Sequence, residues 1–175
     1  MIEHGFGVSL GPISLIPSSQ LLIWRNEPSI YEWCRQYEPL EAWTHEAWLT
    51  SLKSRTDVKM YGVFSDERCV GVCGLTSLDL INRHAEFSLY IAPEEQKKGY
   101  GESALKTLCA HGFSALGLKH IFGETFDGNP ASMMFERVGF IKEGTRRLYY
   151  FREGHFIDAH LYSILDYEFF GKWNC

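Results

Sequence analysis

The sequence lacks the features that mark membrane and nucleic-acid-binding proteins. No apolar run approaches the roughly 18 residues of a membrane-spanning helix, so we expect no membrane partner. The amino end, from Met1 to Phe6, has neither a basic region nor an apolar core, so we expect no signal peptide. The net charge is −5 and no five like charges stand in a row, which argues against binding to nucleic acid.

Motifs for metal ions and disulfides are also missing. The seven histidines form no H-E-x-x-H motif, and no two cysteines form a C-x-x-C pair. We therefore predict no metal site, and reduced thiols in a cytoplasmic protein. The cysteines are Cys34, Cys69, Cys73, Cys109 and Cys175.

What is present is the composition of a globular domain. The chain has 175 residues, of which 45% are hydrophobic and 15% aromatic, enough to form one core. Because no repeat, linker or low-complexity tract interrupts it, we expect a single domain over residues 1–175.

One stretch combines a strand, a glycine-bearing loop and a helix. Residues 85–91 alternate between apolar and polar side chains, which is typical of a half-buried strand. A basic loop follows at 96–101. From Glu102 to about Gly117 apolar residues recur at spacings of three and four, which predicts an amphipathic helix.

The loop has the chemistry of a pyrophosphate cradle. The first N–H groups of a helix lack intrahelical partners and carry partial positive charge. Gly99 and Gly101 let the backbone approach a ligand, and Lys97 and Lys98 add charge. The alternative is that the loop binds no ligand and only connects the strand to the helix, with both lysines in solvent.

The same loop also fits the dinucleotide fingerprint G-x-G-x-x-G/A, from Gly99 to Ala104, with Glu124 as the ribose-binding acid. We consider this reading weaker. The preceding strand alternates, whereas a central parallel strand is apolar on both faces, and the motif lies in the middle of the chain.

The rest of the chain alternates between strand and helix patterns. Thr44 and Asn129 are expected helix caps, and Pro130 is expected at a first helical position. The strand after the glycine-loop helix should run parallel to 85–91, because a helix joins the two. Residues 166–175 are predicted to be a frayed end. We expect strands at 8–16, 58–64, 69–76, 119–125, 140–142, 144–151 and 155–165, and further helices at 18–26, 30–37, 45–54 and 130–138.

The stretch Gln96-Lys97-Lys98-Gly99-Tyr100-Gly101 resembles the Gln/Arg-x-x-Gly-x-Gly/Ala motif of the GNAT acetyltransferase family. The resemblance continues through 129–132 and 137–140. Within the family, this stretch is most similar to the branch of ribosomal-protein N-terminal and spermidine acetyltransferases. The amino half, with Trp24-Arg25-Asn26 and His45, also resembles amino-sugar-nucleotide acetyltransferases.

This resemblance implies the fold. We expect an α/β (α+β) GNAT fold, with a mixed, largely antiparallel and twisted sheet of about seven strands and about four flanking helices. The sheet should be splayed between the fourth and fifth strands, and the strand before the glycine loop should carry a bulge. Dimers are common in this family, so the resemblance also allows a homodimer for this chain.

The resemblance implies acetyl-CoA as the co-substrate, with no metal. Pantetheine would lie in the splayed gap, and a backbone N–H near Leu89 would polarise the thioester carbonyl. Asn129 and Ser132 would contact the pantetheine arm, although Asn129 is equally explained as a cap. The other expected cofactor-binding positions are Leu89, Tyr90, Ile91, Gln96, Lys97, Lys98, Gly99, Tyr100 and Gly101.

An amine that attacks a thioester must lose a proton, and a primary alkyl amine has a pKa of about 10. Glu86, on the polar face of strand 85–91, is the first candidate base, and related polyamine acetyltransferases have Glu at the matching place. Glu124 is the second. The alternative for Glu86 is a solvated residue or one paired with Arg83 or Lys59.

The sequence departs from the family where many members have a tyrosine as general acid. Phe135 stands there and cannot donate a proton. Either the thiolate leaves unaided, or another group serves, for which Tyr90, Tyr149 and Tyr150 are candidates.

We therefore predict an acetyl-CoA-dependent N-acetyltransferase acting on a primary amine of a small molecule, either an amino-sugar nucleotide or a polyamine. The alternatives are a protein N-terminal α-amine acetyltransferase and a non-catalytic acetyl-CoA-binding regulatory module. The aromatic side chains of the amino half either pack the core or form a wall of the acceptor pocket. They are Trp24, Tyr31, Trp33, Tyr37, Trp43 and Trp48.

Overall fold

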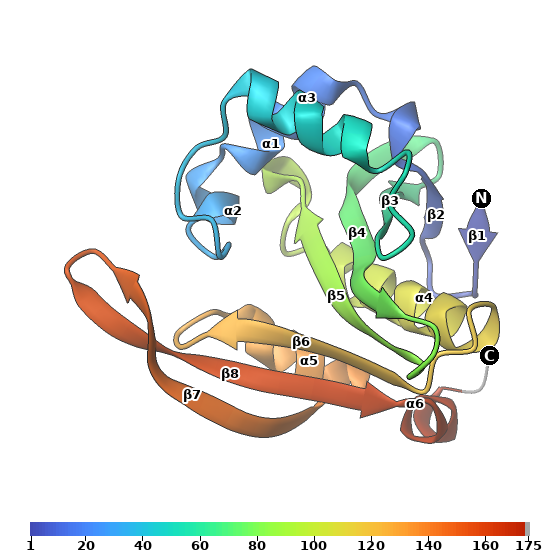
Figure 1. The fold of residues 1–175 in the computed structure, drawn as a ribbon. Coiled ribbons are helices and arrows are strands. Elements are labelled where there is room, and N and C mark those ends of the chain that lie inside the picture. The colour runs from blue at the N-terminus through green and yellow to red at the C-terminus, as the bar shows by residue number, and fades with distance from the viewer. Residues whose placement is uncertain (174–175) are drawn as a thin grey trace.

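The computed structural model describes residues 1–173 and contains one mixed sheet. Its strand order is β1-β2-β3-β4-β5-β6-β8-β7, and every neighbouring pair is antiparallel except β5 with β6 (Figure 1). The strands are β1 (Ile2–Glu3), β2 (Ser9–Pro12), β3 (Lys59–Ser65), β4 (Arg68–Asp79), β5 (His84–Ile91), β6 (His120–Phe126), β7 (Ile141–Arg152) and β8 (His155–Leu165).

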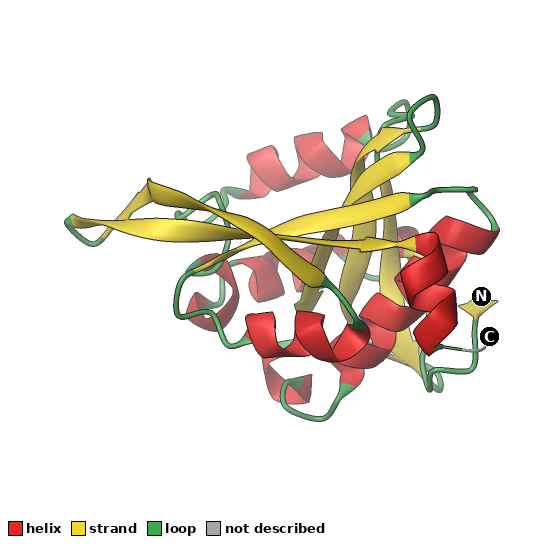
Figure 2. Cartoon of the chain, turned by 90° about the horizontal axis from the view of Figure 1, so that it is seen from below, coloured by secondary structure: helices red, strands yellow, loops and turns green. Residues whose placement is uncertain are grey.

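Helices cover both faces of this sheet (Figure 2). Those of the amino half pack on one face, and those that follow β5 pack on the other. The α-helices are α1 (Ser18–Arg25), α2 (Pro28–Tyr31), α3 (Ala42–Ser51), α4 (Tyr100–Ser114), α5 (Ala131–Val138) and α6 (Asp166–Lys172), and 3-10 turns lie at Ile13–Leu15 and Pro93–Glu95.

Alternation along the strands fills two hydrophobic cores. Val63 packs in the core beneath α4, whereas its neighbour Phe64 packs in the core beneath α1. Cys73 and Val72 on β4 divide in the same way, because successive strand residues point to opposite faces. The predicted α/β fold, a mixed and largely antiparallel sheet flanked by helices, is therefore confirmed, with eight strands and six α-helices within residues 1–173 instead of about seven and about four.

The sheet opens between β5 and β6. The two strands pair at His84–Glu86 with His120–Phe122, and no pairing is recorded beyond Glu86 among the described residues. On its other side β5 remains paired with β4 as far as Ile91. In Figure 1 the two arrows diverge from their shared end. The predicted splay between the fourth and fifth expected strands is confirmed.

The bulge that the resemblance implied in β5 was misplaced. From Glu86 to Ile91, β5 pairs residue for residue with β4. The register instead shifts between Thr76 and Asp79 on β4, where Ser77 has a positive φ of 49°. The extra residue lies in the partner strand.

The amino half differs from the prediction in its boundaries. Strand 8–16 is reduced to β2 followed by a 3-10 turn, and β1 was missed because two residues give no periodic pattern. α3 begins at Ala42 and not at His45, so Thr44 is not its cap. The helix expected at 30–37 is the short α2, and 32–41 is irregular.

The predicted frayed end was also wrong for residues 166–172, which form α6. Glu168 accepts the backbone N–H of Leu165 at 2.9 Å and so caps the helix. Phe169 is fully buried and its ring lies against those of Phe6 and Phe113. Residues 174–175 lie outside the described part of the chain.

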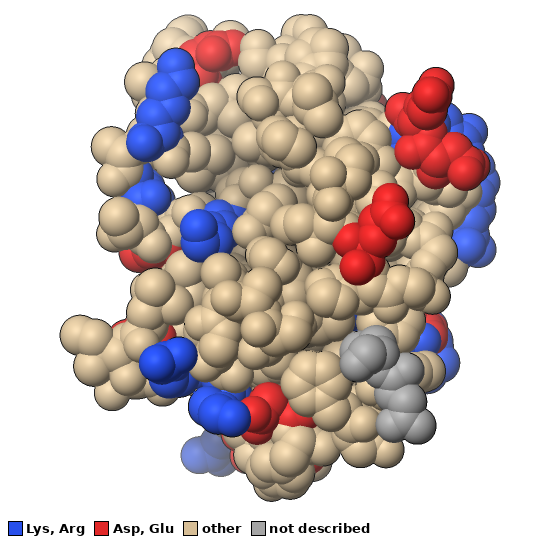
Figure 3. All heavy atoms as spheres, turned by 90° about the vertical axis from the view of Figure 1, so that its right-hand side faces the viewer, with Lys and Arg blue, Asp and Glu red and all other residues tan. Residues whose placement is uncertain are grey.

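No helix within residues 1–173 is long and apolar enough to cross a membrane. On the face shown in Figure 3, acidic and basic side chains stand in small separate groups.

Phe169→Ala should lower the free energy of unfolding by about 3–5 kcal/mol, because it leaves a cavity in the core. The control is Tyr167→Ala on the same helix, since Tyr167 is 68% exposed. Urea unfolding of both variants checks this. Equal, small effects would show that α6 does not contribute to the core.

Candidate active site

A cavity of about 1110 Å³ runs from the glycine loop, through the opening between β5 and β6, to the underside of α3. At one end it is lined by the loop and by the start of α5, and at the other by α3 and β4. Along this opening β5 has no partner on the side of β6. The backbone N–H and C=O groups on that edge are therefore left for a ligand.

The glycine loop has the geometry of an anion site. Lys97 and Gly99 have positive φ values of 62° and 88°, and α4 begins directly afterwards at Tyr100. The side-chain amide of Gln96 donates to the carbonyl oxygen of Ile91 at 3.2 Å, which ties the loop to β5. The free N–H groups of the first turn of α4 therefore lie at the end of the opened strand.

The predicted cofactor residues fall into two groups. Those that line the cavity are Leu89, Tyr90, Ile91, Gln96, Lys97, Gly99, Gly101 and Asn129. Lys98, Tyr100 and Ser132 do not belong to its lining. The Lys98 ammonium pairs with the buried Glu95 at 3.0 Å, and the Ser132 hydroxyl donates to the backbone of Asn129 at 3.0 Å.

Asn129 has the expected capping role. Its Oδ1 accepts the backbone N–H of Ala131 at 2.9 Å, with Pro130 between them in a helical conformation. α5 is assigned from Ala131, one residue later than predicted. The amide side chain also lines the cavity, so the cap leaves a cofactor contact open.

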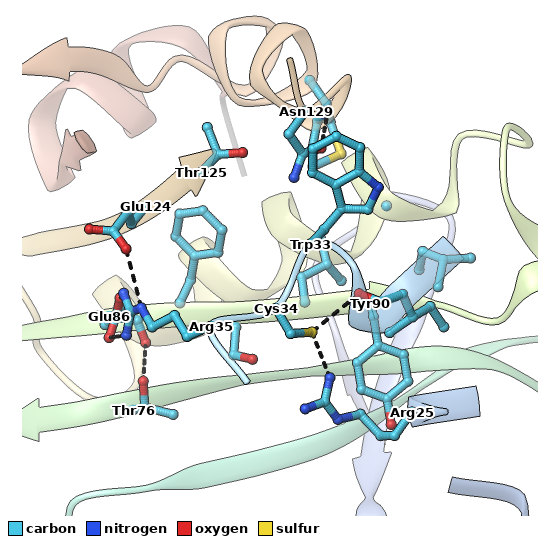
Figure 4. Close-up of a pocket in the computed structure, with 18 of the residues that line it drawn as sticks. Arg25, Trp33, Cys34, Arg35, Thr76, Glu86, Tyr90, Glu124, Thr125 and Asn129 are labelled. Atoms are coloured by element: carbon cyan, nitrogen blue, oxygen red, sulfur yellow. Dashed lines mark hydrogen bonds and ion pairs between the residues drawn. The ribbon is translucent and has the colours of Figure 1, made fainter. Parts of the chain in front are cut away.

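Two carboxylates meet in the middle of the cavity. Glu86 on β5 and Glu124 on β6 both line it, and their side chains are only 13% and 3% exposed. Arg35 reaches between them from the loop after α2 (Figure 4). Its Nη1 donates to Glu86 Oε2 at 3.1 Å, Nη2 contacts Oε1, and Nε donates to Glu124 Oε1 at 3.2 Å.

This arrangement was not foreseen. The expected partner of Glu86 was Arg83 or Lys59, but Arg83 donates to the carbonyl of Gly117 at 3.2 Å. Arg35 lies 51 residues from Glu86 and was expected in a helix, so no local pattern pointed to it. Its hydrogen bonds and its charge pairing with Glu86 raise the pKa of Arg35 further above its usual value.

Glu124 has further partners. Arg146 Nη1 donates to it at 2.8 Å, and the Tyr150 hydroxyl donates at 2.6 Å. Burial and the hydrogen bond to Glu124 raise the pKa of Tyr150. Glu124 therefore has two hydrogen-bond donors besides Arg35, whereas Glu86 depends on Arg35.

The acetyltransferase (GNAT) domain family matches residues 18–141 of this chain. The chain belongs to the GNAT acetyltransferase family. The match covers the opened β5, the glycine loop, α4, β6 and α5.

Named relatives differ in their acceptors. The chain is similar to a putative ribosomal N-acetyltransferase of Bacillus subtilis, 33% identical over 63% of this chain and 61% of the relative. It is also similar to the spermidine N(1)-acetyltransferase of Vibrio cholerae, 28% identical over 62% and 63%. The alignments thus span less than two thirds of the curated relatives' length.

A solved structure supports the fold over nearly the whole chain. It is the crystal structure of spermidine N-acetyltransferase from Vibrio cholerae in complex with CoA and spermine. The TM-score is 0.85, the sequence identity 23%, and the match covers 93% of this chain and 98% of that one.

In this GNAT chain, Phe135 is a core residue. It is 5% exposed, and its ring lies 5.0 Å from that of Phe87 and 5.6 Å from that of Tyr162. Among the tyrosines proposed as substitutes, Tyr150 contacts a carboxylate directly, whereas Tyr149 is 52% exposed. Tyr150 does not line this cavity, and its one O–H proton is donated to Glu124, so it is not free to donate to a leaving group.

Tyr90 lines the cavity, but its ring packs with the apolar side chains beneath α1. Burial raises its pKa, which keeps the hydroxyl protonated, and the Arg25 guanidinium lies 5.9 Å from its ring centroid. Its position beside α1 places it in the wall of the cavity.

Two buried polar atoms on the cavity wall have no hydrogen-bond partner within the described chain. They are Thr125 Oγ1 and His45 Nε2, on residues that are each 3% exposed. His45 was predicted either to contact the acceptor or to face water, and it is buried against Trp48 with ring centroids 5.9 Å apart. Such atoms are natural contacts for a bound ligand.

Desolvation lowers the pKa of His45 below 6.5, so folding favours its neutral form. This contribution to stability is complete above the unfolded pKa of about 6.5 and is lost as the pH falls through the folded value. We expect His45→Gln to weaken the decline of unfolding free energy below pH 6.5, measured by urea titration. The exposed His155→Gln serves as control. Parallel pH profiles for His45→Gln and the unmodified chain would contradict the assignment.

Proposed function

We propose that this chain is an N-acetyltransferase that moves the acetyl group of acetyl-CoA to a primary amine of a small molecule. The observation that carries the proposal is one continuous cavity that joins the glycine loop to two carboxylates across the opening between β5 and β6. One end has the chemistry for a pyrophosphate, and the middle has the chemistry for an amine.

The residues present fit acetyl-CoA. Gly99 has a positive φ of 88°, and an added Cβ there would meet nothing within 4 Å, so the loop leaves open space beside the start of α4. The unpaired Thr125 hydroxyl and the backbone of Leu89 to Ile91 face the opening where pantetheine would lie. When bound, acetyl-CoA supplies an activated acyl group.

The reaction needs one proton acceptor and one good leaving group. The amine nitrogen forms a bond to the acetyl carbon, the C–S bond breaks, and CoA leaves as a thiolate. We assign Glu86 as the base that takes the amine proton, directly or through water, because Glu124 already accepts from Arg146 and Tyr150. We assign no general acid, and the thiolate leaves unaided, because the one O–H of Tyr150 is donated to Glu124.

The acceptor class rests on Glu86 and on the relatives. Glu86, once it is free of Arg35, can pair with a cationic amine, and the likeness to a spermidine acetyltransferase supports a polyamine or a related small amine. The likeness to a putative ribosomal N-acetyltransferase supports a protein amino terminus as the second candidate. Cytoplasmic location stays part of the proposal, supported by free thiols at Cys34, Cys69, Cys73 and Cys109.

The direct test is the release of free CoA from acetyl-CoA with a panel of amines: spermidine, an amino-sugar nucleotide and a peptide with a free amino terminus. We expect release with a small amine. Release with the peptide alone would transfer the proposal to protein amino termini. Acetyl-CoA binding without release from any amine would favour the regulatory module.

In the same assay, Glu86→Gln should lower turnover on the order of 100-fold, because it removes the proton acceptor, and should leave acetyl-CoA affinity unchanged. The control is Glu67→Gln in the turn between β3 and β4, away from the cavity. Unchanged turnover in Glu86→Gln would move the base to Glu124.

A further inference from the structure

Arg35 stands at the boundary between two cavities. The second cavity, of about 700 Å³, lies along β6 and β7. The linings of the two cavities share three residues, which are Arg35, Glu86 and Glu124. The guanidinium therefore lies between the two cavities, at the point where an amine would meet the base.

From this geometry we propose that Arg35 is an internal competitor of the acceptor amine, and that its guanidinium occupies the ammonium position beside Glu86. This rests on the proposed function, because it concerns the amine of the same site. Like an alkylammonium ion, a guanidinium is a cation that donates several N–H bonds to carboxylate oxygens. Both oxygens of Glu86 are in contact with it.

The partners of the two carboxylates indicate where the exchange takes place. Without Arg35, Glu124 keeps its bonds from Arg146 and Tyr150. The Glu86 carboxylate has no other cation or hydrogen-bond donor within residues 1–173. When the guanidinium leaves, Glu86 is therefore the group that needs a new cation, and an incoming ammonium supplies it.

The side chain can leave while the loop stays in place. Arg152 Nη2 donates to the carbonyl oxygens of Cys34 and Arg35, each at 3.2 Å. At the other end, Asn26 exchanges hydrogen bonds of 2.9 and 2.7 Å with the backbone of Leu40. The Arg35 side chain itself is 53% exposed, so rotation about its own bonds carries the guanidinium into solvent.

Arg35 therefore determines which amines gain access. An amine binds only to the fraction of molecules in which Glu86 is free, so its apparent affinity is reduced by that fraction. An acceptor that brings more than one positive charge competes better with the guanidinium than a simple monoamine does.

The first test needs no turnover. Thermal unfolding is followed for the unmodified chain and for Arg35→Ala, with methylguanidinium chloride as the probe. We expect the ion to raise the melting temperature of Arg35→Ala and to leave the unmodified chain unchanged, because the vacated position beside Glu86 binds it. Arg83→Ala, which removes an arginine outside both cavities, should respond like the unmodified chain. Equal responses in all three would overturn the proposal.

The second test is kinetic. Arg35→Ala should lower the KM for spermidine about tenfold without lowering kcat, and methylguanidinium should inhibit this variant competitively against spermidine. If the alanine variant folds poorly, Arg35→Gln, which keeps most of the side-chain length, takes its place and should show the same lower KM. A lower kcat that methylguanidinium restores would mean that Arg35 positions Glu86, which would overturn the competitor role.

The two proposals can fail separately. If no amine releases CoA, the proposed function fails, while the melting temperatures still report whether a cation replaces Arg35. If CoA is released but methylguanidinium has the same effect on the unmodified chain and on Arg35→Ala, only the competitor role of Arg35 fails.

Discussion

The pairing of β5 with β6 stops after Glu86, and the whole site depends on that interruption. The strands pair only as far as Glu86 and Phe122, so Glu124 lies just past the break, and Arg35 bridges the two carboxylates. Beyond the break, β5 keeps its other partner, β4, and β6 keeps its other partner, β8, so the two strands diverge without losing their outer neighbours. The strand thus carries its unpaired edge directly to the glycine loop and the start of α4. One break in a sheet therefore provides a slot for a long ligand without loss of the surrounding core.

Charge is balanced unequally around that slot. Glu124 is nearly inaccessible and is satisfied by Arg146 and Tyr150 together with Arg35. Glu86 is more accessible and depends on one half-exposed arginine. A carboxylate with a single removable partner is suited to binding a substrate cation, whereas a carboxylate with several partners is suited to holding the geometry. The two acidic residues, which the sequence ranked first and second as candidate bases, thus differ in their surroundings.

Short-range patterns predicted the parts that short-range physics determines. The half-buried strand at 85–91, the left-handed Gly99 before α4 and the hydrogen bond that Asn129 accepts at the start of α5 appear as expected, although α4 begins at Tyr100 and so includes Gly101. What could not be predicted depends on distant partners. Arg152, far along the chain, hydrogen-bonds the carbonyls of Cys34 and Arg35 in the irregular segment where a helix over 30–37 was expected. The helix α6 likewise exists because Phe169 fills a core built from distant segments.

The central claim is that the opening between β5 and β6 holds the acyl carrier. A crystal structure of the chain with CoA tests it most directly. The account predicts the phosphates at residues 96–101 and the pantetheine arm between β5 and β6, with the sulfur pointing toward Glu86. CoA bound elsewhere, with the opening empty, would contradict the assignment of this cavity and of both carboxylates.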